Sequence, residues 1–180
     1  MIPAAPVPPL ARRAVPGSAP APGPVVLRAV VPSPVGALEA AATARGVRRL
    51  EPAAPGAAAA PPPPGPLAEA LETARRMLAG EPLAWDGALD PLGDALERAV
   101  WDEVRRVPWG RTTTYGAIAR RLGVAPREVG AALGANRLFL LVPCHRVVAA
   151  DGSPRGFRWG LALKARLLAL ESGQRALLPP

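Results

Sequence analysis

The sequence predicts an α+β fold, in which a small β-meander with one helix is followed by a mainly helical region. The chain has 180 residues, enough for one ordinary domain or for a small domain joined to a smaller partner. Its 25 prolines fall mostly before residue 92, whereas the sustained helical repeats of apolar residues begin near that point. The two halves are therefore expected to differ in secondary structure.

Residues 1–24 are rich in proline and alanine, and we expect them to form a disordered tail. A signal peptide carries its positive charge before an unbroken apolar stretch. Here Arg12 and Arg13 instead follow an apolar stretch that prolines interrupt. No run of about 18 apolar residues is present to cross a bilayer, so we expect no membrane association.

Residues 25–91 are expected to form an N-terminal α/β domain. Short apolar runs at 25–31, 35–41 and 47–50 are separated by turns that contain proline or glycine, a pattern typical of an antiparallel meander. Residues 52–66 are nearly all alanine, proline and glycine, and this composition predicts a loop.

One helix is predicted to close this domain, and another is predicted to open the next. Leu67–Leu78 places apolar residues on one helical face, and Gly80 would end that helix. Residues 92–173 are expected to form the C-terminal domain. Its first helix has apolar residues every four positions from Leu92 and stops before Pro108.

Two further helices are predicted in tandem. Thr112, Thr113 and Thr114 offer N-caps for a helix that begins near Tyr115, and Pro126 suits the first position of the next helix. A three-residue turn between them is typical of a helix-turn-helix motif. A packed helical hairpin without a DNA-binding role would have the same spacing.

Two features of the tandem helices favour DNA as the partner. The predicted outer face carries Arg120, Arg121 and Arg127. The second helix is also rich in small residues, so its backbone could approach a duplex closely; these are Gly130, Ala131, Gly134 and Ala135. Beyond it, the apolar run 138–142 is typical of a strand. A last helix is predicted over Leu161–Glu171, and residues 174–180 are expected to form a loose tail.

The chain has a formal net charge of +8, with 22 basic against 14 acidic residues, and Lys164 is the only lysine. Arginine binds phosphate with a planar fork, so this surface suits nucleic acid. Codon bias towards arginine and ordinary solvated helix faces would give the same composition. Charge alone therefore leaves the partner open.

The only cysteine, Cys144, stands beside the only histidine, His145. This count excludes an internal disulfide and a conventional zinc site, and an unpaired thiol fits a reducing cytoplasm. A cysteine protease would need a histidine brought from elsewhere in the fold, and a redox site would need a second thiol. Either Cys144 is a buried apolar filler, or it is a thiol that attacks once and keeps what it takes.

A base and a positive charge would be needed to form the thiolate, and His145 and Arg146 are the candidates. In a strand-like segment, consecutive side chains point to opposite faces. We therefore expect a water molecule, and not a direct contact, to link Cys144 with His145.

The segment Pro143-Cys144-His145-Arg146-Val147 resembles the active-site signature of the O6-alkylguanine-DNA alkyltransferases, also called methylated-DNA–protein-cysteine methyltransferases. The resemblance covers residues 25–173 and is close from residue 92 onward. Other similar blocks are Leu96–Trp101, Pro108–Thr112, Thr114-Tyr115, Gly134–Asn136, Gly156–Leu161 and Lys164–Glu171, with Ser33–Gly36 and Arg45–Val47 in the first domain. The resemblance to this family implies that the N-terminal domain is ribonuclease H-like.

The resemblance also implies a mechanism. Cys144 would take an alkyl group from O6 of guanine in an irreversible, single-turnover reaction. His145 would accept the thiol proton through a water, and Glu171 would orient His145. Asn136 would hold Cys144 in place, and Tyr115 would crowd the 3′ phosphate and donate a proton to the leaving base.

The implied partner is double-stranded DNA that contains O6-alkylguanine, bound through its minor groove with the damaged base flipped out. Arg127 would fill the gap in the base stack. The other expected DNA contacts are Tyr115, Arg146, Ala132 and Gly134. The alkyl pocket would be lined by Leu133, Val147, Val148, Phe157, Arg158 and Trp159. No metal and no cofactor are expected.

Four positions depart from the pattern of the family or vary within it. Arg137 and Phe139 stand where prolines are common, and Phe157 stands where tyrosine is common. Trp159 is typical of bacterial members and would narrow the pocket towards bulky O6 substituents. These changes bear on substrate range and rate.

Two other functions compete with the alkyltransferase. A non-catalytic sensor would grip alkylated DNA without reacting, but in such relatives the cysteine is replaced. A DNA-binding module with an inert buried thiol would leave Cys144 resistant to alkylating reagents. We expect a monomer in the bacterial cytoplasm, associated with the nucleoid during repair.

Overall fold

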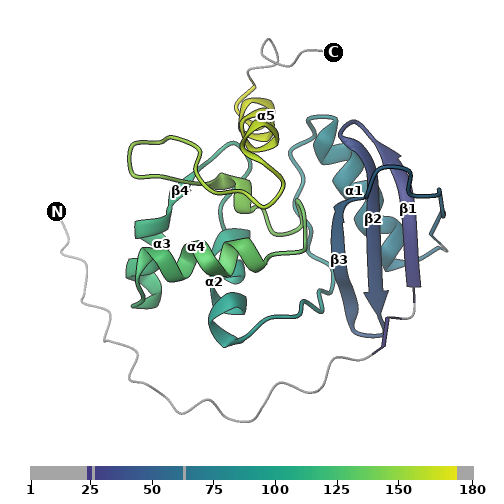
Figure 1. Cartoon of the computed structure of the whole chain (residues 1–180), viewed down its shortest axis with the longest axis horizontal. Helices are drawn as coiled ribbons and strands as arrows, with labels where there is room; N and C mark the ends of the chain where they lie inside the picture. Colours follow the sequence, from purple (N-terminus) through teal and green to yellow (C-terminus); the bar gives the residue numbers. More distant parts are fainter. Residues whose placement is uncertain (1–23, 26, 63, 174–180) are drawn as a thin grey trace.

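The computed structural model describes residues 24–25, 27–62 and 64–173. Its N-terminal part is a three-stranded antiparallel sheet of β1 (Leu27–Ser33), β2 (Gly36–Thr43) and β3 (Gly46–Pro52), in that order across the sheet. Helix α1 (Pro66–Leu78) packs against the sheet, as Figure 1 shows. The predicted meander and helix are therefore confirmed.

The contact between α1 and the sheet is made by small and branched apolar side chains. Ala29, Leu38, Ala40 and Leu50 are fully buried in the strands. Leu67, Ala70, Leu71 and Ala74 repeat at helical spacing on the buried face of α1. The alanines that weaken the strand propensity of β2 also leave room for a helix to lie close to the sheet.

The C-terminal part begins with α2 (Ala95–Arg105). This helix starts three residues later than the apolar repeat suggested, because Asp94 forms a capping box with Glu97. Leu92 lies outside the helix and is 59% exposed. The local capping chemistry thus overrides the apolar periodicity at this helix start.

The two tandem helices are α3 (Tyr115–Leu122) and α4 (Pro126–Ala135), which pack against each other and against α2. The Thr114 hydroxyl caps α3 by accepting a hydrogen bond from the Ala117 amide. Gly123 then ends α3 with φ of +67°, a left-handed conformation that favours glycine. The helices α2, α3 and α4 lie together beside the sheet (Figure 1).

The apolar run 138–142 is not a strand. Its side chains are at most 3% exposed, but Leu140 has φ of +66°, which is incompatible with an extended chain. Only Leu138 forms a β-bridge, with Leu50. A short buried run satisfies the same apolar pattern in a compact turn as in a strand, so the strand prediction was wrong here.

The segment that follows carries the signature residues. Cys144–Arg146 forms the short 3₁₀ helix η1, and β5 (Val147–Val148) pairs in parallel with β4 (Thr113–Thr114). This pairing places the first residue of α3, Tyr115, beside the segment that holds Cys144. The last helix, α5 (Leu161–Glu171), contacts η1.

The N-terminal sheet is joined to the signature segment through the main chain. The Leu50 amide donates to the Arg137 carbonyl at 2.9 Å, and the Phe139 amide donates to the Leu50 carbonyl at 2.7 Å. These two hydrogen bonds attach the segment between α4 and Cys144 to the edge strand β3.

Two expectations concern the tails. Residues 1–23 of the predicted N-terminal tail and the predicted tail 174–180 lie outside the described residues.

Among the helices of the described part, none combines the length and apolarity of a membrane span. The same residues hold no group of three or more metal-binding side chains.

Candidate active site around Cys144

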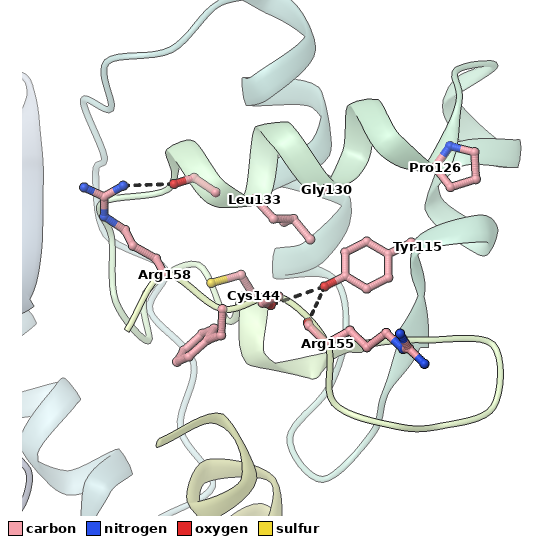
Figure 2. A pocket seen from close by; sticks show the side chains of 10 residues that line it. Tyr115, Pro126, Gly130, Leu133, Cys144, Arg155 and Arg158 are labelled. Atoms are coloured by element: carbon pink, nitrogen blue, oxygen red, sulfur yellow. Dashed lines mark hydrogen bonds between the residues drawn. The ribbon is translucent and has the colours of Figure 1, made fainter. Parts of the chain in front are cut away.

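A cavity of about 510 Å³ lies between α4 and the loop that precedes α5 (Figure 2). One wall is made by the small residues of α4 and the other by the loop, and Cys144, which is 4% exposed, reaches the space between them. The lining residues are Tyr115, Pro126, Gly130, Leu133, Gly134, Cys144, Arg155, Gly156, Phe157 and Arg158. Pockets of about 300–1,000 Å³ with apolar walls are typical of small-molecule sites.

Asn136 holds Cys144 from the end of α4. Its side-chain amide donates to the Cys144 sulfur at 3.2 Å and to the Val142 carbonyl at 3.1 Å. Its side-chain oxygen accepts a hydrogen bond from the Leu138 amide at 2.8 Å. The one asparagine thus fixes both the buried turn 138–142 and the thiol that follows it.

The Cys144 thiol is almost completely buried, although it reaches the cavity. Burial raises the pKa of Cys144 to about 11, and the Asn136 hydrogen bond and the Lys164 charge oppose this rise without cancelling it. At neutral pH the thiol is therefore protonated, and a reaction through the thiolate needs a base.

His145 follows Cys144 directly and is buried against a carboxylate. Its Nε2 lies 2.7 Å from Glu171 Oε1, and the ring is 1% exposed. Burial lowers the pKa of His145, and the contact with Glu171 opposes the change without reversing it. In the neutral ring, Nε2–H donates to the carboxylate, so Nδ1 remains a proton acceptor.

Arg146 belongs to the signature segment and is only 3% exposed. Its Nε and Nη2 donate to the two Glu171 oxygens at 2.8 and 2.9 Å, and Nη1 donates to the Val107 carbonyl at 2.6 Å. The expectation that Arg146 contacts DNA is therefore corrected. The physical reason is that a buried carboxylate at Glu171 requires a counter-charge.

Glu171 is the centre of this buried network. Burial works to raise the pKa of Glu171, but hydrogen bonds and charge from His145 and Arg146 together lower it. The Gly110 amide also donates to the carboxylate, at 3.2 Å. Gly110 has φ of +70°, and a β-carbon there would lie 2.9 Å from the Glu171 carbonyl oxygen, so glycine is needed at this contact.

Tyr115 lies on the other side of the cavity, where its hydroxyl donates to the Arg155 carbonyl at 2.6 Å, as Figure 2 shows. Burial raises the pKa of Tyr115, so the hydroxyl keeps its proton at neutral pH. The hydroxyl is therefore a proton donor that is already directed at the cavity wall.

Lys164 is a residue of the site that the sequence pattern did not single out. It is fully buried, and its Nζ donates to the carbonyls of Val147, Arg155 and Gly156 at 2.6, 2.7 and 3.3 Å. The signal available in the sequence was that this only lysine falls three residues before Leu167, on the face of α5 that was predicted to be buried.

The predicted pocket residues divide into two groups. Leu133, Phe157 and Arg158 line the cavity, whereas Val147, Val148 and Trp159 do not. Val148 instead lines a second cavity, which Gly110 and Glu171 also line. Trp159 lies behind the wall, edge-on to Phe157 and Phe139 with ring centroids 5.2 and 5.0 Å apart.

Trp159 therefore acts on the cavity through Phe157, and its predicted direct role as a pocket lining is corrected. Its ring packs edge-on against both Phe139 and Phe157, and this packing holds it away from the cavity lining. Val147 is likewise corrected, because its side chain is fully buried in the core.

Among the predicted DNA contacts, Arg127 and Gly134 are exposed on α4, and Gly134 lines the cavity. The Gly134 carbonyl accepts a hydrogen bond from Arg158 at 3.0 Å. Ala132 is only 2% exposed, and its carbonyl accepts a hydrogen bond from the Trp101 indole at 2.8 Å. Ala132 thus faces α2, and its expected side-chain contact with DNA is corrected.

Comparison with known proteins places this site in a family. Residues 95–173 match the model of the "6-O-methylguanine DNA methyltransferase, DNA binding domain". A "DNA base-flipping protein" of Thermus thermophilus is 45% identical over 144 residues, which are 78% of this chain and 97% of that protein. A methylated-DNA–protein-cysteine methyltransferase of Mycolicibacterium paratuberculosis is 42% identical over 110 residues, covering 60% of this chain and 67% of that one.

Solved structures agree with this comparison. Mycobacterium tuberculosis OGT in complex with DNA has a TM-score of 0.70 and 32% identity over 81% of this chain and 92% of that chain. The O6-methylguanine methyltransferase of the same organism has a TM-score of 0.68 at 33% identity, with the same coverage. The chain therefore belongs to the O6-alkylguanine-DNA alkyltransferase family, the methylated-DNA–protein-cysteine methyltransferases.

Proposed function

We propose that this protein repairs DNA by moving an alkyl group, typically methyl, from O6 of guanine onto Cys144. The observation that carries the proposal is a thiol that opens into a 510 Å³ cavity on one side and is followed directly by a buried histidine–glutamate pair. The substrate is double-stranded DNA, by analogy with the DNA-bound M. tuberculosis relative.

The transfer balances within the protein and the lesion. His145 accepts the thiol proton through a water, since Nε2–H is already committed to Glu171. The Cys144 sulfur then forms a bond to the alkyl carbon while the carbon–O6 bond breaks, and the electron pair stays with guanine. Guanine takes up one proton from the Tyr115 hydroxyl, and the proton held by His145 passes through solvent to the Tyr115 phenolate, so both side chains end in their starting state.

The product explains a single turnover. A thioether is a poor leaving group towards water, so no hydrolytic step returns the alkylated Cys144 to a thiol. The cavity offers neither a second thiol nor a second imidazole to accept the group, because the chain has one cysteine and one histidine. One molecule of protein would therefore repair one lesion.

DNA would be bound by α4, with α3 supporting it as the first helix of a helix-turn-helix. The exposed small residues of α4 allow close approach of its backbone to the minor groove, and the cavity beneath α4 would receive the flipped base. Arg127, exposed near the start of α4, would occupy the gap in the stack.

Intact-protein mass spectrometry after incubation with a duplex containing one O6-methylguanine tests this function. We expect a gain of one methyl group that maps to Cys144 and stops at one per molecule. Cys144→Ala should still bind the duplex and gain nothing, and a methyl gain in that variant would sink the assignment to Cys144.

A non-catalytic damage sensor is the second candidate, favoured by the Thermus thermophilus relative, which is named a DNA base-flipping protein. Such a sensor would bind the same duplex more tightly than undamaged DNA but would show no mass change at any time. The presence of Cys144 and the His145–Glu171 pair argues against it.

A further inference from the structure

A cavity of about 440 Å³ lies between the N-terminal sheet and the helices α2 and α4, and it shares no lining residue with the cavity at Cys144. Four arginines line it: Arg28, Arg48 and Arg49 from the strands, and Arg137 from the segment that follows α4. Among the described residues that line this arginine cavity, none is acidic. Such a lining favours an anion as the occupant.

Strand pairing gathers three of these arginines on one face of the sheet. Arg28 of β1 and Arg49 of β3 both lie opposite Ala41 of β2, so two long side chains flank a small one. Consecutive residues of a regular strand point to opposite faces. The register shifts between Ala41 and Ala42, however, and this β-bulge lets Arg48 reach the same cavity as Arg49.

Nearby acids compensate only part of this positive charge. Three carboxylates are shared among five arginines in the ion pairs of this region: Glu39, Glu51 and Asp90 with Arg45, Arg48, Arg49, Arg137 and Arg158. Arg28 adds a sixth guanidinium and forms no ion pair with any residue that the structure describes. Within the same residues, the buried Nε of Arg49 has no hydrogen-bond partner. The cavity therefore keeps positive charge and donor capacity that the protein does not satisfy.

Apolar side chains share the rim of the cavity with the arginines. Among the described residues, three large hydrophobic side chains are exposed, and two of them, Val25 at 37% and Leu92 at 59%, line this cavity. A free inorganic anion gains nothing from apolar contacts. A nucleic acid strand, in contrast, presents an apolar deoxyribose beside each phosphate. The mixed lining therefore favours a sugar–phosphate backbone.

Helix α4 separates the arginine cavity from the active-site cavity. Leu133 and Gly134 line the active-site cavity, whereas Ala135 lines the arginine cavity. Successive residues of an α-helix lie about 100° apart around its axis. Gly134 and Ala135 therefore lie on opposite flanks of the exposed ridge of α4 that carries Arg127 and Ala131.

This arrangement matches the two strands of a duplex. A helix that lies in a DNA groove has one sugar–phosphate backbone on each flank. The strand with the flipped nucleotide would lie on the flank of the active-site cavity. The other flank, with the arginine cavity, would then face the undamaged strand.

We propose that the arginine cavity binds backbone phosphates of the undamaged strand, with Arg28 and Arg137 as the residues that contact them. Both side chains are exposed, whereas Arg48 and Arg49 lie deeper and add to the positive field. The proposal rests on the proposed function for the position of the duplex. It assigns to the N-terminal domain a DNA contact that alkyl transfer itself does not require.

The test measures affinity for a duplex with one O6-methylguanine over a series of salt concentrations. Each phosphate contact releases counterions, so it steepens the slope of log affinity against log salt by about 0.9. We expect the slope to become shallower by about 1 in Arg28→Gln and by about 2 in the double variant with Arg137→Gln. Arg28→Lys keeps the charge and should restore the wild-type slope.

The matched control is Arg75→Gln. It removes the same charge from the same domain, but Arg75 lies on the exposed face of α1, away from the arginine cavity. Its slope should equal that of the wild type. An equal loss of slope in Arg75→Gln and Arg28→Gln would mean that only net charge matters, and it would overturn the proposal. A wild-type slope in the double variant would overturn it as well.

Neutral methylphosphonate linkages identify the strand. They replace phosphates in the undamaged strand of one duplex and in the damaged strand of another. With the undamaged strand neutral, the wild type and the double variant should show the same slope, because the phosphates that the arginines contact are no longer charged. With the damaged strand neutral, the difference of about 2 should remain. The reverse pattern overturns the assignment to the undamaged strand.

Inorganic phosphate tests for a site that takes a free anion instead. Such a site would raise the melting temperature of the wild type in phosphate but not that of the double variant, while the two proteins bind the duplex with equal slopes. That outcome overturns the proposal. Thermal unfolding also shows that each variant is folded. If the double variant does not fold, Arg28→Gln decides alone, since Arg28 is exposed.

Methyl transfer to the wild type separates this proposal from the proposed function. If no methyl group is gained but the slopes differ as expected, alkyl transfer fails and the phosphate contact stands. If a methyl group is gained and the slopes agree, the phosphate contact fails and alkyl transfer stands.

Discussion

The two sides of Cys144 differ in polarity and in burial. Towards the cavity most of the lining residues are small or apolar, as with Gly130, Leu133 and Phe157. Away from the cavity, His145, Arg146 and Glu171 form a buried polar network. The difference shows that the surface that would receive a base and the groups that would activate the thiol are built from separate residues. Substitutions should therefore separate binding from chemistry.

Burial of the polar network costs free energy, and the network is stable because each of its charged groups has a partner. Arg146 makes a two-pronged contact with Glu171, and His145 and Gly110 satisfy the remaining capacity of the carboxylate. A network in which all members are satisfied tolerates burial, whereas removal of one member leaves an uncompensated charge. The predictions below test this contrast.

His145→Gln should give the largest change in rate. Glutamine has no basic nitrogen to take the thiol proton, so methyl transfer should slow by about 10²–10⁴-fold, the range for loss of a general base. Binding to the duplex should change little, because His145 is buried. Single-turnover transfer and duplex binding are measured side by side, and an unchanged transfer rate at neutral pH would refute the activation scheme.

The pH profile of the wild type reports the same base. Neutral His145 is the acceptor, so transfer should fall when the ring is protonated. Because burial lowers the pKa of His145 from its ordinary 6.5, the fall in transfer rate on acidification should occur below pH 6.5. A transfer rate that already halves above pH 6.5 would contradict the neutral, buried imidazole.

Glu171→Gln should mainly affect stability. It leaves the Arg146 charge buried without a counter-ion, and breaking a buried pair costs about 3–5 kcal/mol. Urea unfolding measures the loss in free energy of unfolding. Glu72→Gln is the control, since that carboxylate pairs with Arg75 on the exposed face of α1 and should cost less than about 1 kcal/mol. Equal losses in both variants would mean that the buried network is not special.

Asn136→Ala should have an intermediate effect. It removes the acceptor of the Leu138 amide and the donors to Val142 and Cys144 in a buried turn, at a cost of about 1–3 kcal/mol. Transfer should also slow, since the thiol is no longer held. Thermal unfolding and transfer rates check this, with Ser153→Ala in an exposed turn as the control. A stable variant with a normal rate would show that the turn 138–142 holds Cys144 unaided.

Arg127→Ala should have the smallest effect. It should weaken the interaction with duplex DNA without changing the chemistry of alkyl transfer. Stacking of an exposed guanidinium is worth about 0.5–1 kcal/mol, so repair of duplex DNA should fall about two- to fivefold. Reaction with the free modified base should not change, because Arg127 does not line the cavity. If both rates fall equally, Arg127 does not fill the stack.

Most of the secondary structure followed from local signals. The tandem helices were predictable because Thr114, Gly123 and Pro126 mark their ends, and α5 was predictable from its leucines. The run 138–142 was not predictable, because its conformation depends on Asn136 and on the bridge between Leu50 and Leu138, partners that lie outside the run. Apolar periodicity reports burial and not backbone conformation in so short a segment.

The same division holds for the site. The sequence by itself determined the family through its signature and flanking blocks, and it was enough to predict the reactive pair, because a single cysteine beside a single histidine leaves no other nucleophile and base of these types. It could not assign Arg146, whose position beside the signature is compatible with either a phosphate contact or a buried ion pair.

Only the tertiary structure decided these remaining roles. Folding of α5 against η1 brings Glu171 to His145 and Arg146, and it brings Lys164 to the carbonyls of a loop eight and nine residues before it in the chain. Packing of Phe139 and Phe157 places Trp159 behind the cavity wall. The physical reason is that the environment of a charge or a ring is set by neighbours that are distant in sequence, and these neighbours decide its partners and its pKa.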